Sequence, residues 1–179
     1  KNSSAITAAG PGLLNLMCAG ETKPQTAVIE MCADPNFTPG SRAASRETLG
    51  LPANEKIVAY SGSLYQSRGV SELFALICML SASNPEIQWV ISGRIEPRLK
   101  LPSNVHHLGY IEDSKVVDVL RASNAMLCVN RPDKFGDFSY PVKLYEALAS
   151  NTPVIAFRTQ SVEFVLRDRN DLLVPYGDL

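Results

Sequence analysis

The sequence predicts an α/β fold in which helices cover both faces of a doubly wound parallel sheet. Short apolar runs alternate with helical patterns along most of the chain, and this alternation is typical of parallel sheets. A polar or glycine-containing loop follows most of the predicted strands. Because ligands of such sheets bind at the carboxyl ends of the strands, these loops are the expected place of a binding site.

The first 39 residues are expected to form a short unit that precedes the main sheet. Residues 4–7 and 27–31 are predicted strands, and residues 11–17 are a predicted helix that a proline opens. A polar connection over residues 33–40 then leads into the rest of the chain. We therefore place a boundary after residue 39, with one larger domain over residues 40–179.

The larger domain repeats the pattern of strand and helix. The predicted strands lie at residues 56–61, 87–92, 105–109, 125–129 and 154–156. The predicted helices start at Ser41, at Val70, at Asp113 or Ser114 as the capping residue, and near Pro141. Gly50 and Asn151 are expected to end the first and the last of these helices.

Composition and charge indicate an ordinary globular protein. The chain is 45% hydrophobic and 20% charged, with a net charge of −1, so it offers no electrostatic basis for binding DNA or RNA. No stretch approaches the roughly 20 apolar residues of a membrane-spanning helix, and no signal peptide opens the chain. Its four cysteines are far apart, and we expect them to be reduced core thiols of a cytosolic protein. The chain begins abruptly at Lys1, as a fragment would.

The stretch over residues 133–156 is the strongest candidate for a binding site. Lys143 and Glu146 lie three residues apart in the helix predicted after Pro141, so they share one face of it. Both lean toward the helix N-terminus, where free N–H groups and the helix dipole favour an anion. A cation and a carboxylate then point at one spot. The alternative is an exposed ion pair, which contributes about 0.2–0.5 kcal/mol and has no functional role.

Three other turns after strands are further candidates. The loop over residues 62–69 carries two glycines and Arg68, which suits an anion, although such a loop is also a plain connection in many sheets. Gly93 and Arg94 follow the next strand, and Tyr110 and Ile111 follow the strand after it. A simple strand end is the alternative for the last pair.

The two histidines are not expected to bind a metal. His106 and His107 are adjacent in a predicted strand, so their side chains point to opposite faces. We find no Cys-x-x-Cys and no Asp-x-Asp motif, and we predict a site that needs no metal.

Residues 141–156 resemble a signature of the retaining glycosyltransferases with two Rossmann-like domains (the GT-B type). These enzymes include the sucrose-phosphate synthases and bacterial mannosyl- and glucosyltransferases. The family signature is a Glu, seven residues, a second Glu and a small-residue helix that ends in Gly-x-Pro-Val-Ile-Ala. Glu146 matches the second Glu, Asn151 stands where Gly is usual, and Phe138 stands at the position of the first Glu. A variant of the signature, Pro-x-Lys-x-x-Glu, matches completely from Pro141 to Glu146.

Other segments resemble the same family. Gly62 and Gly69 match Gly-Arg-x-x-x-x-Lys-Gly, with Ser63 in place of the Arg and Arg68 in place of the Lys. Gly93 and Arg94 stand where the family has Gly-x-Gly, and Tyr110 with Ile111 resembles a Gly-aromatic-Ile turn whose backbone pairs with the nucleotide base. Ile29, Asp34 and Pro39 match a motif that the family has where the chain crosses from the N-terminal to the C-terminal domain. Residues 171–178 resemble the Gly-x-Leu-x-x-Pro-x-Asp motif near the end of the family's C-terminal domain.

This resemblance implies a Rossmann-like half of a GT-B fold that binds a nucleoside-diphosphate sugar. It implies that Glu146 holds the ribose hydroxyls and that Arg68 and Lys143 neutralise the departing diphosphate. Gly62, Ser63, Gly93, Arg94, Tyr110 and Ile111 would line the donor site, and the backbone N–H groups of Ser139 and Tyr140 would meet the donor sugar. Residues 1–39 would come from the N-terminal domain and the crossing, and residues 40–179 would be the donor-binding domain.

The resemblance also implies the context of the reaction. The sugar would pass to an acceptor hydroxyl of a glycan or of a lipid-linked sugar, held by an N-terminal domain. The full-length protein would be cytoplasmic, with possible peripheral association with the inner face of a membrane, and the site would need no metal or other cofactor. Two alternatives remain open: a non-catalytic nucleotide-binding or assembly module of the same fold, and a relative of the UDP-sugar epimerases.

Overall fold

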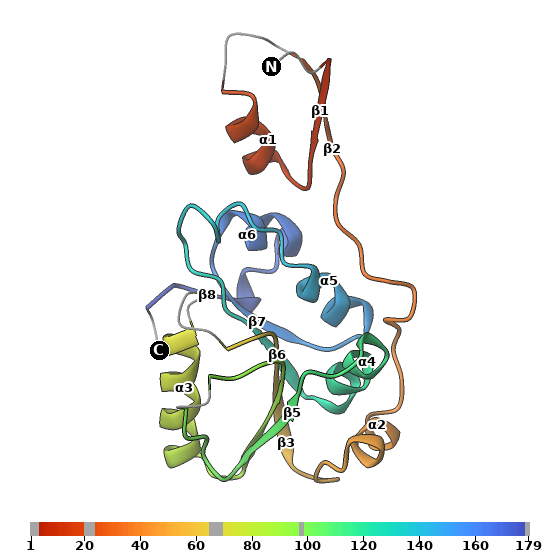
Figure 1. Ribbon diagram of the computed structural model, residues 1–179, viewed down its shortest axis with the longest axis vertical. Helices are drawn as coiled ribbons and strands as arrows, with labels where there is room; N and C mark the ends of the chain where they lie inside the picture. Colours follow the sequence, from red (N-terminus) through yellow and green to blue (C-terminus); the bar gives the residue numbers. More distant parts are fainter. Residues whose placement is uncertain (1–3, 20–23, 65–69, 97–98, 178–179) are drawn as a thin grey trace.

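The structure is a computed structural model that describes residues 4–19, 24–64, 70–96 and 99–177. Two parallel sheets organise it, a small one near the N-terminus and a large one that contains most of the chain (Figure 1). None of the helices in these ranges combines the length and the apolar character that crossing a membrane requires. Phe37, before the predicted boundary at residue 39, is already part of the core of the large sheet.

The small unit contains two strands and one helix. β1 (Ala5–Ala8) pairs in parallel with β2 (Gln25–Val28), and α1 (Pro11–Met17) connects them. The prediction for α1 is confirmed. The second strand was expected at residues 27–31, but the ladder with β1 ends at Val28, and the apolar Ile29 and Met31 are exposed beyond it. Hydrophobicity therefore marked the region of this strand but misplaced it by two or three residues.

The large sheet has six parallel strands in the order β5-β4-β3-β6-β7-β8. Its strands are β3 (Lys56–Ser61), β4 (Ile87–Ser92), β5 (Val105–Gly109), β6 (Ala125–Cys128), β7 (Val154–Phe157) and β8 (Leu173–Val174). Its helices are α2 (Arg42–Leu49), α3 (Val70–Ser83), α4 (Asp113–Ala122), α5 (Val142–Ala149) and α6 (Gln160–Leu166), with a 3₁₀ turn at Asn170–Leu172. The doubly wound parallel α/β fold is confirmed.

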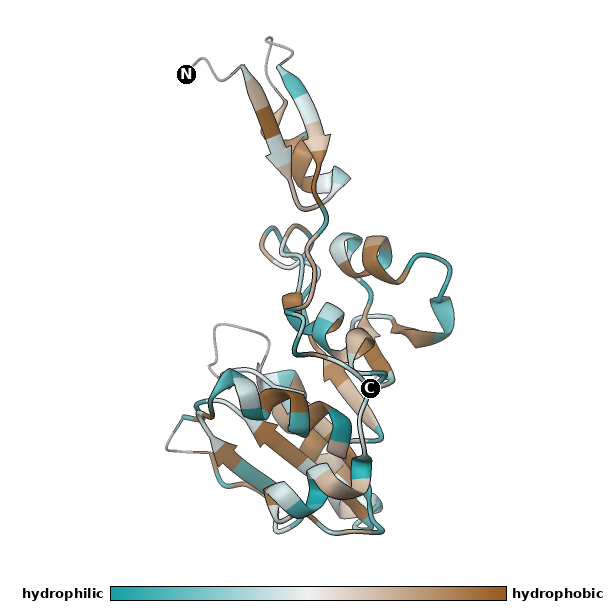
Figure 2. Ribbon diagram, turned by 90° about the vertical axis from the view of Figure 1, so that its right-hand side faces the viewer, coloured by the Kyte–Doolittle hydropathy of each residue, from teal (hydrophilic) through white to brown (hydrophobic). Residues whose placement is uncertain are grey.

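Alternate side chains of the central strands feed two different cores. On one face Ile57, Ala59 and Val90 pack in a buried cluster that includes residues of α4, α5 and α6. On the other face Trp89 and Ile91 pack with Leu73 and Ile77 of α3 and with Leu64. Figure 2 shows these strands as mainly apolar bands beneath helices with mixed surfaces. Helices on both faces explain why the central strands read as continuous apolar runs.

The ends of several helices follow the predicted chemistry, and one does not. Ser41 Oγ accepts a hydrogen bond from the Ala44 N–H at the start of α2, and Gly50 and Asn151 adopt left-handed conformations after α2 and α5. The expectation that Asp113 or Ser114 caps α4 is wrong. Asp113 is the first helical residue, and Glu112 precedes it without a side-chain capping bond.

The expectation about the cysteines needs a correction. All four are free, but only Cys128 in β6 is buried, and burial raises the pKa of its thiol to about 12. Cys32 is exposed, and Cys18 and Cys78 are partly exposed. The apolar run around Cys128 correctly predicted that this cysteine is buried. Cys32 is exposed because the connection that carries it lies on the surface.

Candidate functional site

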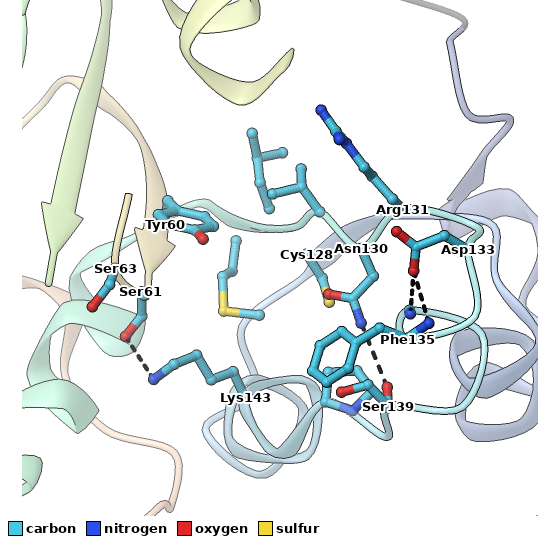
Figure 3. A pocket seen from close by; sticks show the side chains of 16 residues that line it. Tyr60, Ser61, Ser63, Cys128, Asn130, Arg131, Asp133, Phe135, Ser139 and Lys143 are labelled. Carbon is cyan, nitrogen blue, oxygen red and sulfur yellow. Dashed lines mark hydrogen bonds between the residues drawn. The ribbon is translucent and has the colours of Figure 1, made fainter. Parts of the chain in front are cut away.

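A pocket of about 450 Å³ opens where β3 and β6 end (Figure 3). β3 and β6 are neighbours in the sheet, and the chain departs in opposite directions from this pair, toward β4 on one side and β7 on the other. Such a switch point leaves a crevice between the connections, where ligands of doubly wound sheets bind. The lining residues are Tyr60, Ser61, Gly62, Ser63, Met126, Leu127, Cys128, Val129, Asn130, Arg131, Asp133, Phe135, Gly136, Ser139, Pro141 and Lys143.

Lys143 brings a positive charge to this pocket from the first turn of α5. Its Nζ donates a hydrogen bond to Ser61 Oγ at 3.2 Å, at the end of β3. Ser61 Oγ also accepts a bond from the buried Ser92 Oγ at 3.0 Å, which fixes the hydroxyl between β3 and β4. Among the described residues Lys143 forms no ion pair, so its charge is available to an anion in the pocket.

Glu146 lies one turn further along α5 with an unpaired carboxylate oxygen. Its Oε2 is buried and has no hydrogen-bond partner. Burial raises the pKa of Glu146, the charge of Lys143 opposes this effect, and the charge of Asp113 adds to it. The alternative of an exposed ion pair between Lys143 and Glu146 is not what forms. A buried, unpaired acceptor is costly, so a hydrogen-bond donor that reached this oxygen would stabilise the ionised carboxylate.

The first residues after β3 and β4 pack against each other through glycines. The Gly62 N–H donates to Ser92 O at 2.8 Å, and the Gly93 N–H donates to Gly109 O at 2.7 Å. Gly93 has a φ of 132°, and a Cβ there would overlap the carbonyl of Gly62. A side chain at Gly93 would therefore push the Gly62 loop into the pocket, which explains the glycine.

Arg94 and Tyr110 meet at the ends of β4 and β5, outside the pocket lining. The Arg94 guanidinium lies 5.7 Å from the centre of the Tyr110 ring, and the tyrosine is 77% exposed. Ile111 packs against the core directly after it. Asp113, whose charge acts on Glu146, is two residues further on.

Ser139 and Tyr140 face different surroundings. Ser139 lines the pocket, and its carbonyl accepts a bond from Asn130 Nδ2 at 3.5 Å. The Tyr140 ring instead lies against the N-terminal unit, where a Cβ on Gly10 would overlap it. Burial raises the pKa of Tyr140, and the nearby backbone N–H groups of Gly12 and Leu13 oppose this effect. The tyrosine side chain thus joins the site loop to the N-terminal unit.

A family model described as "Glycosyl transferases group 1" matches residues 55–179, which is most of the chain. The chain belongs to this family. The matched range contains all the elements from β3 to β8, and with them the whole lining of the pocket.

Among curated relatives of this glycosyltransferase chain is a D-inositol 3-phosphate glycosyltransferase of Saccharomonospora viridis. It is 27% identical over 161 residues, which cover 79% of this chain and 36% of the relative. The chain thus spans about a third of the length of that relative.

Solved structures show the same fold. Sucrose-phosphate synthase from Thermosynechococcus elongatus matches with a TM-score of 0.76 and 25% identity, over 99% of this chain and 46% of that chain. Anabaena HepE, solved with UDP and glucose, matches with a TM-score of 0.75 and 19% identity, over 98% of this chain and 50% of that chain. Each match covers about half of the larger protein.

The structure gathers some of the predicted site residues and leaves others apart. Ser63, Gly62, Ser139 and Lys143 line the pocket, whereas Glu146, Gly93, Arg94, Tyr110, Ile111 and Tyr140 lie outside its lining. Arg68 and Gly69 lie outside the described residues. Among the residues that are described, no three His, Cys, Asp or Glu side chains gather where they would hold a metal ion.

The loop after β6 contributes polar residues that the sequence analysis missed. Arg131 Nη2 pairs with Glu72 Oε1 at 2.6 Å, and the Tyr176 hydroxyl donates to the same oxygen at 2.8 Å. Burial opposes ionisation of Glu72, but these and other hydrogen bonds outweigh it and hold its pKa at about 2. The available signal was the position of Asn130 and Arg131 directly after an apolar strand, the same rule that selected Gly93 and Arg94.

Proposed function

We propose that this chain is the donor-binding part of a retaining glycosyltransferase that moves a sugar from a nucleoside diphosphate to an acceptor hydroxyl. The observation that carries the proposal is Glu146. Its Oε2 is buried and lacks a hydrogen-bond donor, and the charges of both Lys143 and Asp113 act on it. A nucleotide supplies what each of these groups lacks: ribose hydroxyls for the carboxylate, phosphates for the ammonium group and a base edge for the turn at Tyr110 and Ile111.

Two cations carry the chemistry in this proposal. Lys143, which is already directed at Ser61 by its hydrogen bond, stabilises negative charge on the diphosphate as the sugar departs. Arg68, from the loop after β3, contacts the same diphosphate. Electrostatic stabilisation of this kind needs no metal when protein cations neutralise the phosphates. We therefore propose a metal-independent transfer with retention at the anomeric carbon.

The acceptor belongs to the other half of the enzyme in this proposal. The relatives are about three times as long as the part that this chain matches. Residues 1–39 then represent the end of an acceptor-binding domain and the crossing, and residues 40–179 the donor domain. We place the full-length protein in the cytoplasm, with a glycan or a lipid-linked sugar as acceptor, and with peripheral membrane association if the acceptor is a lipid.

A non-catalytic nucleotide-binding module is the second candidate. Ser63 stands where the family has an arginine, and Phe138 stands where it has a glutamate and lies near Gly12. Such a module retains Glu146 but does not need cations that favour the transition state over the bound donor.

Calorimetry with UDP, GDP and ADP tests the proposal. We expect a dissociation constant in the micromolar to millimolar range for one of them and no sugar transfer by this chain alone, because one wall of the interdomain cleft is absent. No heat and no thermal shift at millimolar nucleotide would reject donor binding. The two candidates are then separated by a transfer assay with the sugar derivative of the nucleotide that binds. The assay uses a longer protein that includes an N-terminal domain, and only a glycosyltransferase would transfer the sugar.

A further inference from the structure

The pocket has two ends of different chemistry. Lys143 and Ser61 form one end, and Asp133 and Arg131 form the other, with Phe135 between them (Figure 3). A diphosphate is attracted to the lysine end and repelled by a carboxylate. The Asp133 end therefore suits a neutral, hydroxyl-rich part of a ligand.

Asp133 is held rigidly, yet half of its carboxylate is unused. Its Oδ1 accepts the N–H groups of Phe135 at 2.9 Å and Gly136 at 2.8 Å. These two bonds, from Gly136 first and Phe135 second, lower the pKa of Asp133 and keep it ionised. Among the described residues, Oδ2 has no hydrogen-bond partner. The loop that presents it is tight, because a Cβ at Gly136 would overlap the Arg131 carbonyl.

An amide and an apolar ring share the pocket lining with this carboxylate, whereas the Arg131 guanidinium extends away from it (Figure 3). Arg131 uses Nη2 to bind Glu72, while its Nε is buried and has no partner. Asn130 presents an amide from the same loop, and the Phe135 ring is 70% exposed at the pocket. A fixed acceptor, the amide of Asn130 and an exposed ring match a sugar, which has hydroxyl edges and apolar C–H faces.

The neighbouring position Phe138 does not offer this chemistry. A Cβ on Gly12 of α1 would lie 3.5 Å from the Phe138 ring, so the ring is turned toward the N-terminal unit. Phe138 is also absent from the pocket lining. The carboxylate that the described part of the pocket does contain is Asp133.

We propose that Asp133 is a specificity-determining residue whose Oδ2 accepts hydrogen bonds from the hydroxyls of the donor sugar, with the Asn130 amide as a further polar group of the same loop. This inference rests on the proposed function and adds the sugar subsite to it. The diphosphate lies at Lys143, and the sugar extends from there toward the loop after β6. The loop sequence, rather than α5, then selects among donor sugars.

Asp133→Asn tests this proposal with little change of shape. The amide oxygen still accepts from Phe135 and Gly136, but an N–H₂ donor replaces the free acceptor. Asp137→Asn is the matched control, because Asp137 is in the same loop and bonds the Gln160 N–H outside the pocket. Calorimetry compares UDP-glucose with UDP and GDP-mannose with GDP in the wild type and both variants. The measured quantity is the ratio of the two dissociation constants, in which effects on the nucleotide cancel.

We expect Asp133→Asn to raise the dissociation constant of the sugar nucleotide, relative to that of its diphosphate, by about tenfold, which corresponds to the loss of one charge-assisted hydrogen bond. Asp137→Asn should leave it unchanged. A ratio within twofold of the wild type overturns the sugar subsite, and so does equal tightening of both ligands, which would place Asp133 beside the phosphates. If Asp133→Asn melts early, Asp133→Ser keeps an acceptor for the turn and is subject to the same criterion. A wild type that binds no diphosphate rejects the proposed function itself.

Discussion

Glu146→Gln separates a ribose-binding carboxylate from a structural one, because the two roles predict changes of opposite kind. The ribose role predicts weaker binding, by about 1.5–3 kcal/mol for one charge-assisted hydrogen bond. At 1.4 kcal/mol per factor of ten, this is a loss of about 10- to 150-fold. The affinities for the nucleoside and for the nucleoside diphosphate should fall by the same factor, since both ligands contain the ribose.

The Glu146→Gln variant should be more stable than the wild type at pH 7, although it binds nucleotides more weakly. Burial raises the pKa of Glu146 in the folded protein, so the folded state binds a proton more readily than the unfolded chain. Proton binding to Glu146 therefore contributes fully to the free energy of unfolding at pH values below the pKa of this residue in the unfolded chain. This contribution is lost as the pH rises through its pKa in the folded protein. At pH 7 the ionised carboxylate is therefore a cost, and Glu146→Gln should melt higher than the wild type. The advantage should vanish in acid.

Titration with uridine and UDP, or with guanosine and GDP, measures the first effect, and thermal unfolding at pH 7 and pH 4 measures the second. Glu47→Gln is the matched control, because Glu47 is an exposed residue of α2 before the amino end of β3. Unchanged affinity in a folded Glu146→Gln variant would refute the ribose role. A lower melting temperature at pH 7 would refute the cost of the buried charge.

Three further predictions concern the diphosphate end and the strand ends. Lys143→Met and Arg68→Ala should each weaken UDP binding but spare uridine, and the loss should shrink as salt screens the charges; an equal loss for uridine would contradict the assignment. Diphosphate affinity should survive EDTA, and a tenfold fall on chelation would show that a metal takes part. Gly93→Ala should lower stability by about 1–3 kcal/mol in urea unfolding, because an L-residue at a φ of 132° is strained and its Cβ meets Gly62. Gly177→Ala, with a φ of 87° but open space around it, should cost less.

Periodicity predicted the buried part of this fold and failed where the chain is exposed. β3, β4 and β5 begin and end at the predicted residues, because apolar alternation and burial coincide there. β2 was misplaced because none of its residues is buried, so the apolar residues after it carried no information about pairing. The cap of α4 was wrong because the helix begins at Asp113, so both predicted capping residues lie inside its first turn.

The candidate site divides in a similar way. The spacing of Lys143 and Glu146 predicted neighbouring positions on α5, but it did not predict that only Lys143 lines the pocket while Glu146 Oε2 is buried without a partner. Asp133 was not predicted, because its position depends on two backbone bonds within an irregular loop and on Gly136 passing close to Arg131. No period marks such a loop, and the sequence names its polar residues without saying which of them face a pocket.

The contact between Tyr140 and the N-terminal unit connects the site loop to the small sheet. Gly10 has no room for a Cβ beside the tyrosine ring. Tyr140 follows directly after Ser139 of the pocket and precedes α5, which carries Lys143. The N-terminal unit therefore contacts the loop that leads into α5, so a change of side chain at Gly10 would displace Tyr140, the residue next to Ser139 of the pocket.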